Sequence, residues 1–214
     1  MKITVISDTH GLHHSLALAA GDVLIHGGDF TEIGEFEEAI DFIEWVAKQP
    51  FAEKIVIAGN HDFCMEEENH SELEQYFAKL GVHYLNDSGC EIDGINFWGS
   101  PITPVFFNWA FNRNRGAQIR QHWSLIPPNT DVLITHGPPL GMLDQCGEPP
   151  ENVGCKDLLA RVNYLKPRVH VFGHIHSATG ITRHDNTLFI NAAVLDDANN
   201  LAHQPKQFEL GVHT

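Results

Sequence analysis

The sequence predicts an α/β fold in a single domain over residues 1–214. Short aliphatic and β-branched runs alternate with segments whose apolar residues recur every three or four positions, as buried strands and amphipathic helices do. In the second half of the chain, strand-like runs follow one another without long helices between them, so part of the sheet structure is expected to be antiparallel. The composition, with 43% hydrophobic and 19% charged residues, is that of an ordinary globular protein.

Five runs are predicted as buried strands, and they lie at residues 2–7, 22–26, 54–58, 131–136 and 169–173. The apolar spacing predicts helices in three places, at 35–48, 71–80 and 156–165. Shorter strands are expected at 91–92, 96–98, 181–183 and 187–190, with Asp185-Asn186 as a hairpin turn. Residues 100–116 and 137–155 are predicted as loops.

Charge and cysteine content restrict the classes of partner and compartment. The 13 Lys and Arg residues face 28 Asp and Glu, and the resulting net charge of −15 repels long nucleic acids. No run approaches the ~18 apolar residues of a membrane span, and the N-terminus has no signal-peptide pattern. The four cysteines form no C-x-x-C pair, which is typical of free thiols. We therefore expect a cytoplasmic protein with no membrane partner.

Each predicted core strand is followed directly by residues that can bind a metal ion. In chain order these are Asp8-Thr9-His10, Gly28-Asp29, Asn60-His61-Asp62, His136, and His174-Ile175-His176. Each motif alone is ordinary turn chemistry. Because the carboxyl ends of strands in an α/β sheet gather at one edge, their joint occurrence predicts one shared site.

The types of residue in this set favour two divalent ions. Carboxylate, imidazole and amide ligands without a thiolate suit Mn²⁺, Fe²⁺, Zn²⁺ or Mg²⁺, and seven ligands exceed the roughly four that one zinc ion takes. Two such ions about 3.5 to 4 Å apart can activate a water molecule between them and polarise a phosphoryl group. Their positive charge would attract a compact phosphate.

The order and content of these motifs resemble the signature of the calcineurin-like metallophosphoesterase superfamily. The short chain and the segment Asn-Trp-Ala-Phe-Asn at 108–112 resemble its compact metallophosphoesterase-domain (MPPED-type) branch. The resemblance implies a four-layer αββα sandwich of two mixed sheets flanked by helices.

The resemblance also implies roles for individual residues. The first metal would be held by Asp8, His10 and His176, Asp29 would bridge, and the second metal would be held by Asn60, His136 and His174. With Asn60, His61 would contact the substrate, stabilise charge on the phosphoryl group and protonate the leaving oxygen. Asp62 would orient His61, although a role as turn former or helix cap is the alternative for this residue.

These expectations combine in a binuclear metal-dependent phosphoesterase, foremost a phosphodiesterase. A hydroxide bridging the two metals, Mn²⁺ first and Fe²⁺, Zn²⁺ or Mg²⁺ as alternatives, would attack small phosphate diesters such as cyclic nucleotides. Two other classes stay open: a low-turnover nucleotide-binding regulatory protein and a protein phosphatase.

The aromatic segment 104–115 has three interpretations, namely substrate recognition, packing on the core and contact between copies of the chain. For the first, Phe111 would stack on a nucleobase while Asn112 and Arg113 contact the rest of the substrate. His26 lies inside an apolar run and is predicted to be a buried, hydrogen-bonded histidine, not a ligand.

Overall fold

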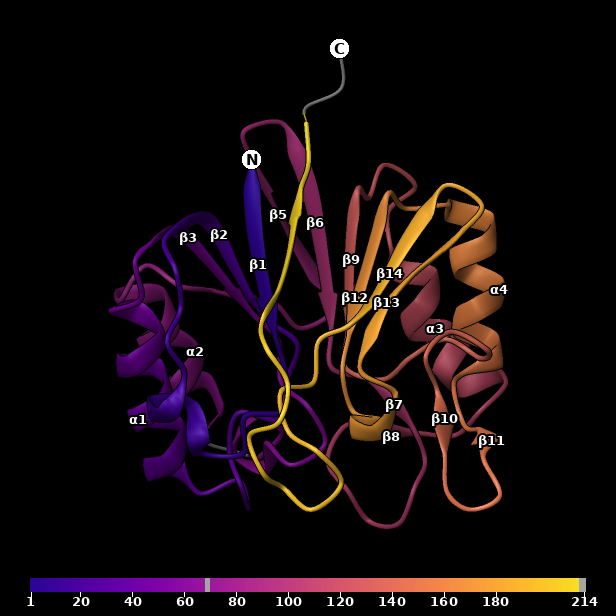
Figure 1. The fold of residues 1–214 in the computed structure, drawn as a ribbon, viewed down its shortest axis with the longest axis horizontal. Coiled ribbons are helices and arrows are strands. Elements are labelled where there is room, and N and C mark those ends of the chain that lie inside the picture. Colours follow the sequence, from indigo (N-terminus) through magenta and orange to yellow (C-terminus); the bar gives the residue numbers. More distant parts are fainter. Residues whose placement is uncertain (68–69, 212–214) are drawn as a thin grey trace.

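The fold is a sandwich of two β-sheets with helices on both outer faces, in the layer order αββα (Figure 1). It was analysed in a computed structural model that describes residues 1–67 and 70–211, so residues 68–69 and 212–214 of the predicted domain lie outside the described part. The predicted fold class is confirmed.

The first sheet has the strand order β15-β1-β2-β3-β4. Its strands are β15 (Lys206–Glu209), β1 (Lys2–Ile6), β2 (Gly21–His26), β3 (Phe51–Val56) and β4 (His83–Tyr84). All neighbours pair in parallel except β15, which runs antiparallel to β1. Two helices cover the outer face of this sheet, α1 (Phe36–Ala47) and α2 (His70–Lys79) (Figure 1).

The second sheet has the order β13-β14-β12-β9-β6-β5. Its strands are β13 (Gly180–His184), β14 (Thr187–Asn191), β12 (Val169–Phe172), β9 (Val132–Thr135), β6 (Ile95–Ser100) and β5 (Ser88–Ile92). The four inner strands are parallel, and the outer pairs β5–β6 and β13–β14 are antiparallel, as expected. Helices α3 (Ala117–Leu125) and α4 (Lys156–Leu165) lie outside it (Figure 1).

Shorter elements lie mainly in the connections. They are the 3₁₀ turns η1 (Leu12–Ser15), η2 (Phe63–Met65) and η3 (His176–Ala178), and the two-residue strands β7 (Thr103–Pro104), β8 (Asn112–Arg113), β10 (Gln145–Cys146) and β11 (Glu151–Asn152). The first turn follows β1, the second follows β3, and the third follows β12. All three therefore begin close to the motifs singled out in the sequence.

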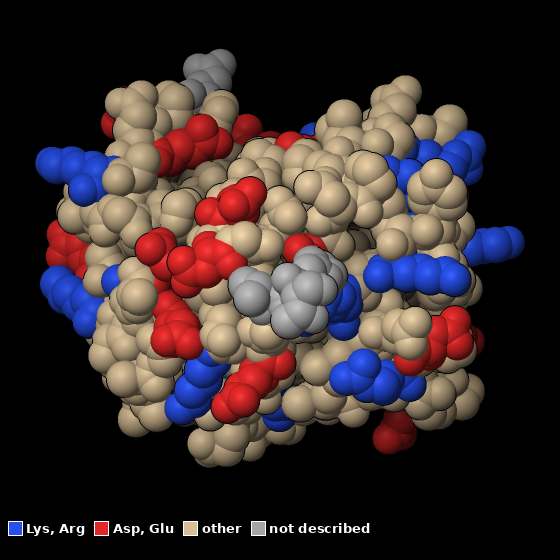
Figure 2. All heavy atoms as spheres, turned by 90° about the horizontal axis from the view of Figure 1, so that it is seen from above, with Lys and Arg blue, Asp and Glu red and all other residues tan. Residues whose placement is uncertain are grey.

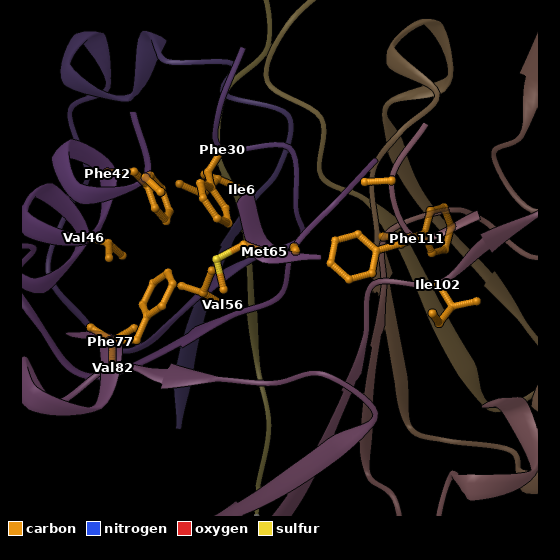
Figure 3. Close-up of a cluster of buried hydrophobic side chains, with 14 of the residues drawn as sticks. Ile6, Phe30, Phe42, Val46, Val56, Met65, Phe77, Val82, Ile102 and Phe111 are labelled. Atoms are coloured by element: carbon orange, nitrogen blue, oxygen red, sulfur yellow. The ribbon is translucent and has the colours of Figure 1, made fainter. Parts of the chain in front are cut away.

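Alternation of side chains along the strands builds the three apolar interfaces of the sandwich. Val5 and Ile25 belong to the cluster between the two sheets, with Ile134 facing them from β9. Their neighbours Ile6 and Leu24 point instead to the helices and join a second cluster, part of which is shown in Figure 3. Burial on both faces accounts for the continuous apolar runs of the inner strands.

The sheets are joined where their parallel strands end. Ser7, directly after β1, forms a parallel bridge with Ala193, which follows β14. The connections that follow β1, β2, β3, β9 and β12 gather at this end, which is the lower end in Figure 1. This arrangement brings the predicted ligand motifs of both sheets within reach of one another.

Helix α3 and strand β15 were not predicted, nor were β4 and the four two-residue strands within the predicted loops 100–116 and 137–155. Helix α3 buries only Ile119 and Trp123, so its apolar repeat is too sparse to stand out in the sequence. Strand β15 alternates between half-buried and exposed residues at the edge of the first sheet, and its sequence, KQFE, carries three polar residues. In the part of the chain that the structure describes, no helix is long and apolar enough to cross a membrane.

Charged side chains are unevenly spread over the face opposite to the ligand motifs. Figure 2 shows this face from above, with Asp and Glu gathered around its middle and most Lys and Arg nearer its edges. The absence of long nucleic acids among the partners stays a prediction.

Candidate metal centre

The structure brings all seven predicted ligand side chains to one site. Among them are two groups of three residues, and within each group one nitrogen or carboxylate oxygen of every residue lies within 4.8 Å of the others. The groups are Asp8, His10, His176 and Asp29, His136, His174. Asn60 adjoins the second group, with its Oδ1 at 3.0 Å from Nε2 of His136. Each group combines residues from both sheets, so the site forms only when the sheets pack together.

Asp29 lies between the two groups. Its Oδ2 is 3.8 Å from Nε2 of His10 and 3.1 Å from Nε2 of His136. Its other oxygen, Oδ1, accepts a hydrogen bond from the backbone N–H of His61 at 2.8 Å. One carboxylate oxygen thus faces an imidazole of each group, which is the position that a bridging ligand requires.

Backbone carbonyls orient two of the imidazoles. Nδ1 of His136 donates to the carbonyl of Gly27 at 2.9 Å, and Nδ1 of His176 donates to that of Asp196 at 3.1 Å. A proton on Nδ1 leaves Nε2 as the electron-pair donor in the neutral ring. Nε2 of His176 lies 3.5 Å from Oδ1 of Asp8.

Four of the proposed ligands lie in the left-handed region of backbone conformation. Asp8, His10, Asp29 and His174 have positive φ values of 57°, 39°, 55° and 68°. Such conformations cost free energy in residues other than glycine and concentrate at functional sites. At Gly173 there is no room for a side chain, because a Cβ there would overlap the carboxylate of Asp8.

The protonation of the buried groups follows from their mutual contacts. Burial alone would raise the pKa of Asp8, but His176 and His136 lower it to about 2. Burial would lower the pKa of His136, but Asp29 and Asp8 raise it to about 9. Burial and the neighbouring His136 lower the pKa of His174 to about 4. Facing imidazoles also lower the pKa of Asp29, so the Asp8 and Asp29 carboxylates stay charged at neutral pH.

The donor set fits divalent metal ions. Nε2 of His10 is buried without a hydrogen-bond partner among the described residues, although it lies next to Asp29. Two fully buried carboxylates with facing imidazoles need a cation or protons to balance their charge. A ligand set of oxygen and imidazole nitrogen suits Mn²⁺, Fe²⁺ and Zn²⁺. A further group, His13, His14 and Asp41, lies apart from this site between η1 and α1.

His61 lies at the edge of the site. Its Nδ1 donates to the carbonyl of Glu32 at 2.7 Å, and its ring stacks on Trp109 with centroids 4.2 Å apart. The ring also contacts His10 edge-on at 4.5 Å. Two contacts therefore hold the imidazole, while one of its nitrogens lies within 4.8 Å of donor atoms of both His10 and Asp29.

Among the described residues, Asp62 makes no hydrogen bond to the His61 side chain, so the expected orienting contact is not seen. Its fully buried carboxylate accepts backbone N–H bonds from Asp29 at 2.9 Å, Thr31 at 2.9 Å and Gly59 at 2.7 Å. It also accepts from the hydroxyl of Thr31 at 2.7 Å. Asp62 thus ties the loop after β3 to the loop after β2, because the backbone N–H groups of both turn toward it.

The structure does not bring Phe111, Asn112 and Arg113 into the site, so their expected contact with substrate is not supported. Phe111 is 2% exposed and lies in the buried apolar cluster (Figure 3). The Asn112 amide donates to the carbonyls of Phe106 and Phe107, both at 3.1 Å. Arg113 pairs with Glu66 at 3.1 Å. These side chains hold the loop in place instead.

Other residues of the same loop, together with residues near the C-terminus, do reach the site. The cavity at the metal ligands has a volume of about 260 Å³, and Phe106, Trp109, Asp197 and Asn199 line it beside the ligands. We call this cavity the metal pocket. No sequence motif marks Asp197 or Asn199, because residues 196–200 form an irregular loop far along the chain. Phe106 is 57% and Phe107 77% exposed, and contact between copies through 104–115 stays a prediction.

Comparison with known proteins relates this geometry to a family. The model of the calcineurin-like phosphoesterase family matches residues 1–178. UPF0046 protein K07C11.7 of Caenorhabditis elegans is 42% identical over 219 residues, covering 97% of this chain and 74% of that protein. Metallophosphoesterase domain-containing protein 1 of Homo sapiens is 39% identical over 214 residues, covering 90% of this chain and 66% of that protein. The chain thus spans two thirds to three quarters of these relatives.

Solved structures share the fold at low sequence identity. The protein TT1561 of Thermus thermophilus superposes with a TM-score of 0.60 at 10% identity, over 89% of this chain and 88% of that one. Another crystal structure reaches a TM-score of 0.69 at 17% identity, over 98% of this chain and 99% of that one. At this level of identity, the two structures show only that they share the fold of this chain.

Proposed function

The chain belongs to the calcineurin-like phosphoesterase family, and from this premise we propose that it hydrolyses small phosphate diesters with two divalent metal ions, Mn²⁺ first. The observation that carries the proposal is the position of Asp29, one oxygen of which faces His10 and His136 at 3.8 Å and 3.1 Å. One carboxylate shared by two ligand groups is the arrangement that a binuclear centre needs.

Seven residues would hold the ions. Asp8, His10 and His176 form the first set, Asn60, His136 and His174 form the second, and Asp29 belongs to both. When bound, the ions would neutralise charge on the phosphoryl oxygens and lower the pKa of an attacking water. The protein's part is to fix the donor atoms, which the carbonyls of Gly27 and Asp196 do by holding Nδ1 of His136 and His176.

His61 would supply the proton that the departing alcohol needs. Its Nδ1 is occupied by the Glu32 carbonyl, so Nε2 is the nitrogen available to a substrate. Stacking on Trp109 restricts rotation of the ring, which lines the metal pocket. A general acid at this position would protonate the leaving oxygen as the P–O bond breaks.

The dimensions of the metal pocket support a small substrate. Its volume of about 260 Å³ is enough for a phosphoryl group and part of one ester group. A folded phosphoprotein would need an extended groove, so the protein phosphatase ranks below the diesterase. The four free cysteines support a reducing compartment, and we propose the cytosol.

Hydrolysis of bis-p-nitrophenyl phosphate and of p-nitrophenyl phosphate would test the proposal. The protein is stripped with a chelator and assayed before and after addition of Mn²⁺, and bound metal is counted on the same sample. We expect two ions per chain and a kcat/KM for the diester above that for the monoester. Two bound ions without turnover of either compound would favour a nucleotide-binding regulator, and fewer than two would contradict the binuclear centre.

A further inference from the structure

A second cavity opens directly beside the metal pocket. It has a volume of about 370 Å³ and shares Phe106, Cys146, His174 and Ile175 with the metal pocket as lining residues. Because both cavities share these walls, a molecule whose phosphate lies at the proposed ligands can extend into the second cavity. We call the second cavity the apolar pocket.

The walls of the apolar pocket favour an apolar occupant. Beyond the shared residues, its lining side chains include Pro104, Val105, Pro138 and Val153. Val105 and Val153 are 50% and 38% exposed, so apolar surface that an occupant could cover faces solvent here.

One charged residue, Arg115, lines the apolar pocket among the described residues. Its guanidinium donates to the carbonyls of Val153 and Gly154, both at 2.9 Å. These bonds anchor the side chain to the wall and give each of the two carbonyls a hydrogen-bond donor. A strongly hydrated group would lose water in this pocket and find few partners in return.

The position of His61 indicates which part of a diester would enter the apolar pocket. His61 lines the metal pocket but not the apolar pocket. The oxygen that departs must lie next to the group that protonates it. The ester group in the apolar pocket is therefore the one that stays on phosphorus.

We propose that the apolar pocket binds the retained ester group of the substrate, and that the substrates are phosphodiesters with one aromatic or alkyl alcohol. This inference rests on the proposed function. In the reaction, the oxygen of water forms a bond to phosphorus, the bond from phosphorus to the departing alcohol oxygen breaks, and that oxygen takes up a proton. The product is a monoester whose apolar group still occupies the pocket.

The test compares methyl p-nitrophenyl phosphate with phenyl p-nitrophenyl phosphate in the Mn²⁺-loaded protein. Both esters release p-nitrophenol, so only the retained group differs, and each rate is divided by the rate of the same ester in Mn²⁺ buffer. We expect kcat/KM to be on the order of 10- to 100-fold higher for the phenyl ester, as burial of a phenyl ring predicts. Equal values for the two esters would overturn the inference while leaving the diesterase intact.

Variants locate the preference in the pocket. Val153→Asp places a charge on the wall, and Val105→Ala is a milder change in case the first variant does not fold. We expect either variant to reduce the phenyl preference by a factor of about 3 to 10 while turnover of the methyl ester changes little. Ile181→Asp is the matched control, since Ile181 is 49% exposed on β13 and does not line the pocket. A preference that persists in both pocket variants would overturn the inference.

A binding measurement separates this inference from the proposed function. Phenylphosphonate and methylphosphonate are not hydrolysed, and their Kd values are measured by calorimetry on the Mn²⁺-loaded protein. Tighter binding of phenylphosphonate in the wild type, reduced in Val153→Asp, supports the pocket even if neither diester is turned over, a result that would contradict the proposed function alone. Equal Kd values would overturn the pocket inference.

Discussion

The two sheets contribute different chemistry to the proposed metal centre. The first sheet supplies both carboxylates, Asp8 and Asp29, together with Asn60 and His10, whereas the second supplies three imidazoles, His136, His174 and His176. Negative charge thus comes from one side of the sandwich and most of the imidazole nitrogens from the other. Because each ligand group draws on both sheets, a bound ion would hold the two halves together and stabilise the fold.

Behind this site the two halves resemble each other. His26 ends β2 and His170 lies in β12, and each is fully buried. The ring of His26 bonds to the Thr9 hydroxyl at 3.0 Å, and that of His170 bonds to the Thr135 hydroxyl at 2.8 Å. Both threonines directly adjoin proposed ligands. The halves therefore differ in the ligands themselves but share a buried imidazole that supports the adjacent loop.

The largest effect is expected from Asp29→Asn. An amide lacks the charge that holds ions in both groups, so bound metal should fall from two ions per chain to one or none, and kcat by on the order of 10³ or more. Metal analysis and diester turnover on the same sample measure both quantities. Asp22→Asn, at the exposed opposite end of β2, is the control and should keep both ions. Full metal content in Asp29→Asn would contradict the bridging position.

His61→Ala should separate proton transfer from metal binding. It removes the proposed acid but no proposed ligand, so two ions should stay bound while kcat falls by about 10² to 10⁴. His184→Ala, which removes an exposed histidine at the end of β13, is the control and should change neither quantity. If metal content fell together with activity, His61 would be a ligand and not the acid.

The location of the site could be predicted because strand ends are legible in a sequence. Buried strands such as 131–136 and 169–173 stand out as apolar runs, and the polar residue after each marks where the run ends. Parallel pairing then places these ends at one edge, whichever helices lie between them. This is why all seven predicted ligand side chains meet in the structure, although they span residues 8 to 176.

The surroundings of the site could not be predicted in the same way, because they depend on loop conformation. Asp62 was expected to orient His61, but the loop after β2 turns its N–H groups toward that carboxylate instead. Phe111 was expected to contact substrate, but a hydrogen bond from its N–H to Glu66 helps to fix it over the core. The Glu32 carbonyl that holds His61 leaves no side-chain signal at all.

The shared buried histidines predict a dependence of stability on pH. Burial lowers the pKa of His26 and of His170 to about 3, below the value of about 6.5 in the unfolded chain. Each ring then favours the folded state above pH 6.5, and this contribution is lost as the pH falls toward 3. At pH 5 the loss is about 2 kcal/mol per ring.

Urea unfolding of chelator-stripped His26→Leu and His170→Leu at pH 7 and pH 5 measures this loss. On going from pH 7 to pH 5, the free energy of unfolding should fall less in each variant than in the wild type. An unchanged loss in both variants would mean that neither ring is neutral in the fold.

Trp109→Ala tests a contact that crosses between the two halves. Trp109 lies in the connection from β7 to β8 of the second half and stacks on His61 of the first. Loss of stacking, worth about 0.5–1.5 kcal/mol, should lower kcat up to about tenfold with KM and metal content little changed. Trp109→Phe keeps a ring and should recover most of the activity. Two results would exclude a positioning role: kcat and KM falling by the same factor, so that kcat/KM is unchanged, or no change in either constant.

The smallest expected effect distinguishes the two buried histidines from each other. Nδ1 of His26 accepts the N–H of Gly28 at 3.2 Å, whereas Nδ1 of His170 has no hydrogen-bond partner among the described residues. His26→Leu therefore removes the partner of the Gly28 N–H and of the Thr9 hydroxyl, whereas in His170→Leu the Thr135 hydroxyl keeps its hydrogen bond to the Gly137 carbonyl. At pH 7 His26→Leu should lower the free energy of unfolding by about 1 kcal/mol more. Urea unfolding of the two variants side by side measures this difference, and equal losses would show that the Gly28 contact adds nothing to the first half of the molecule.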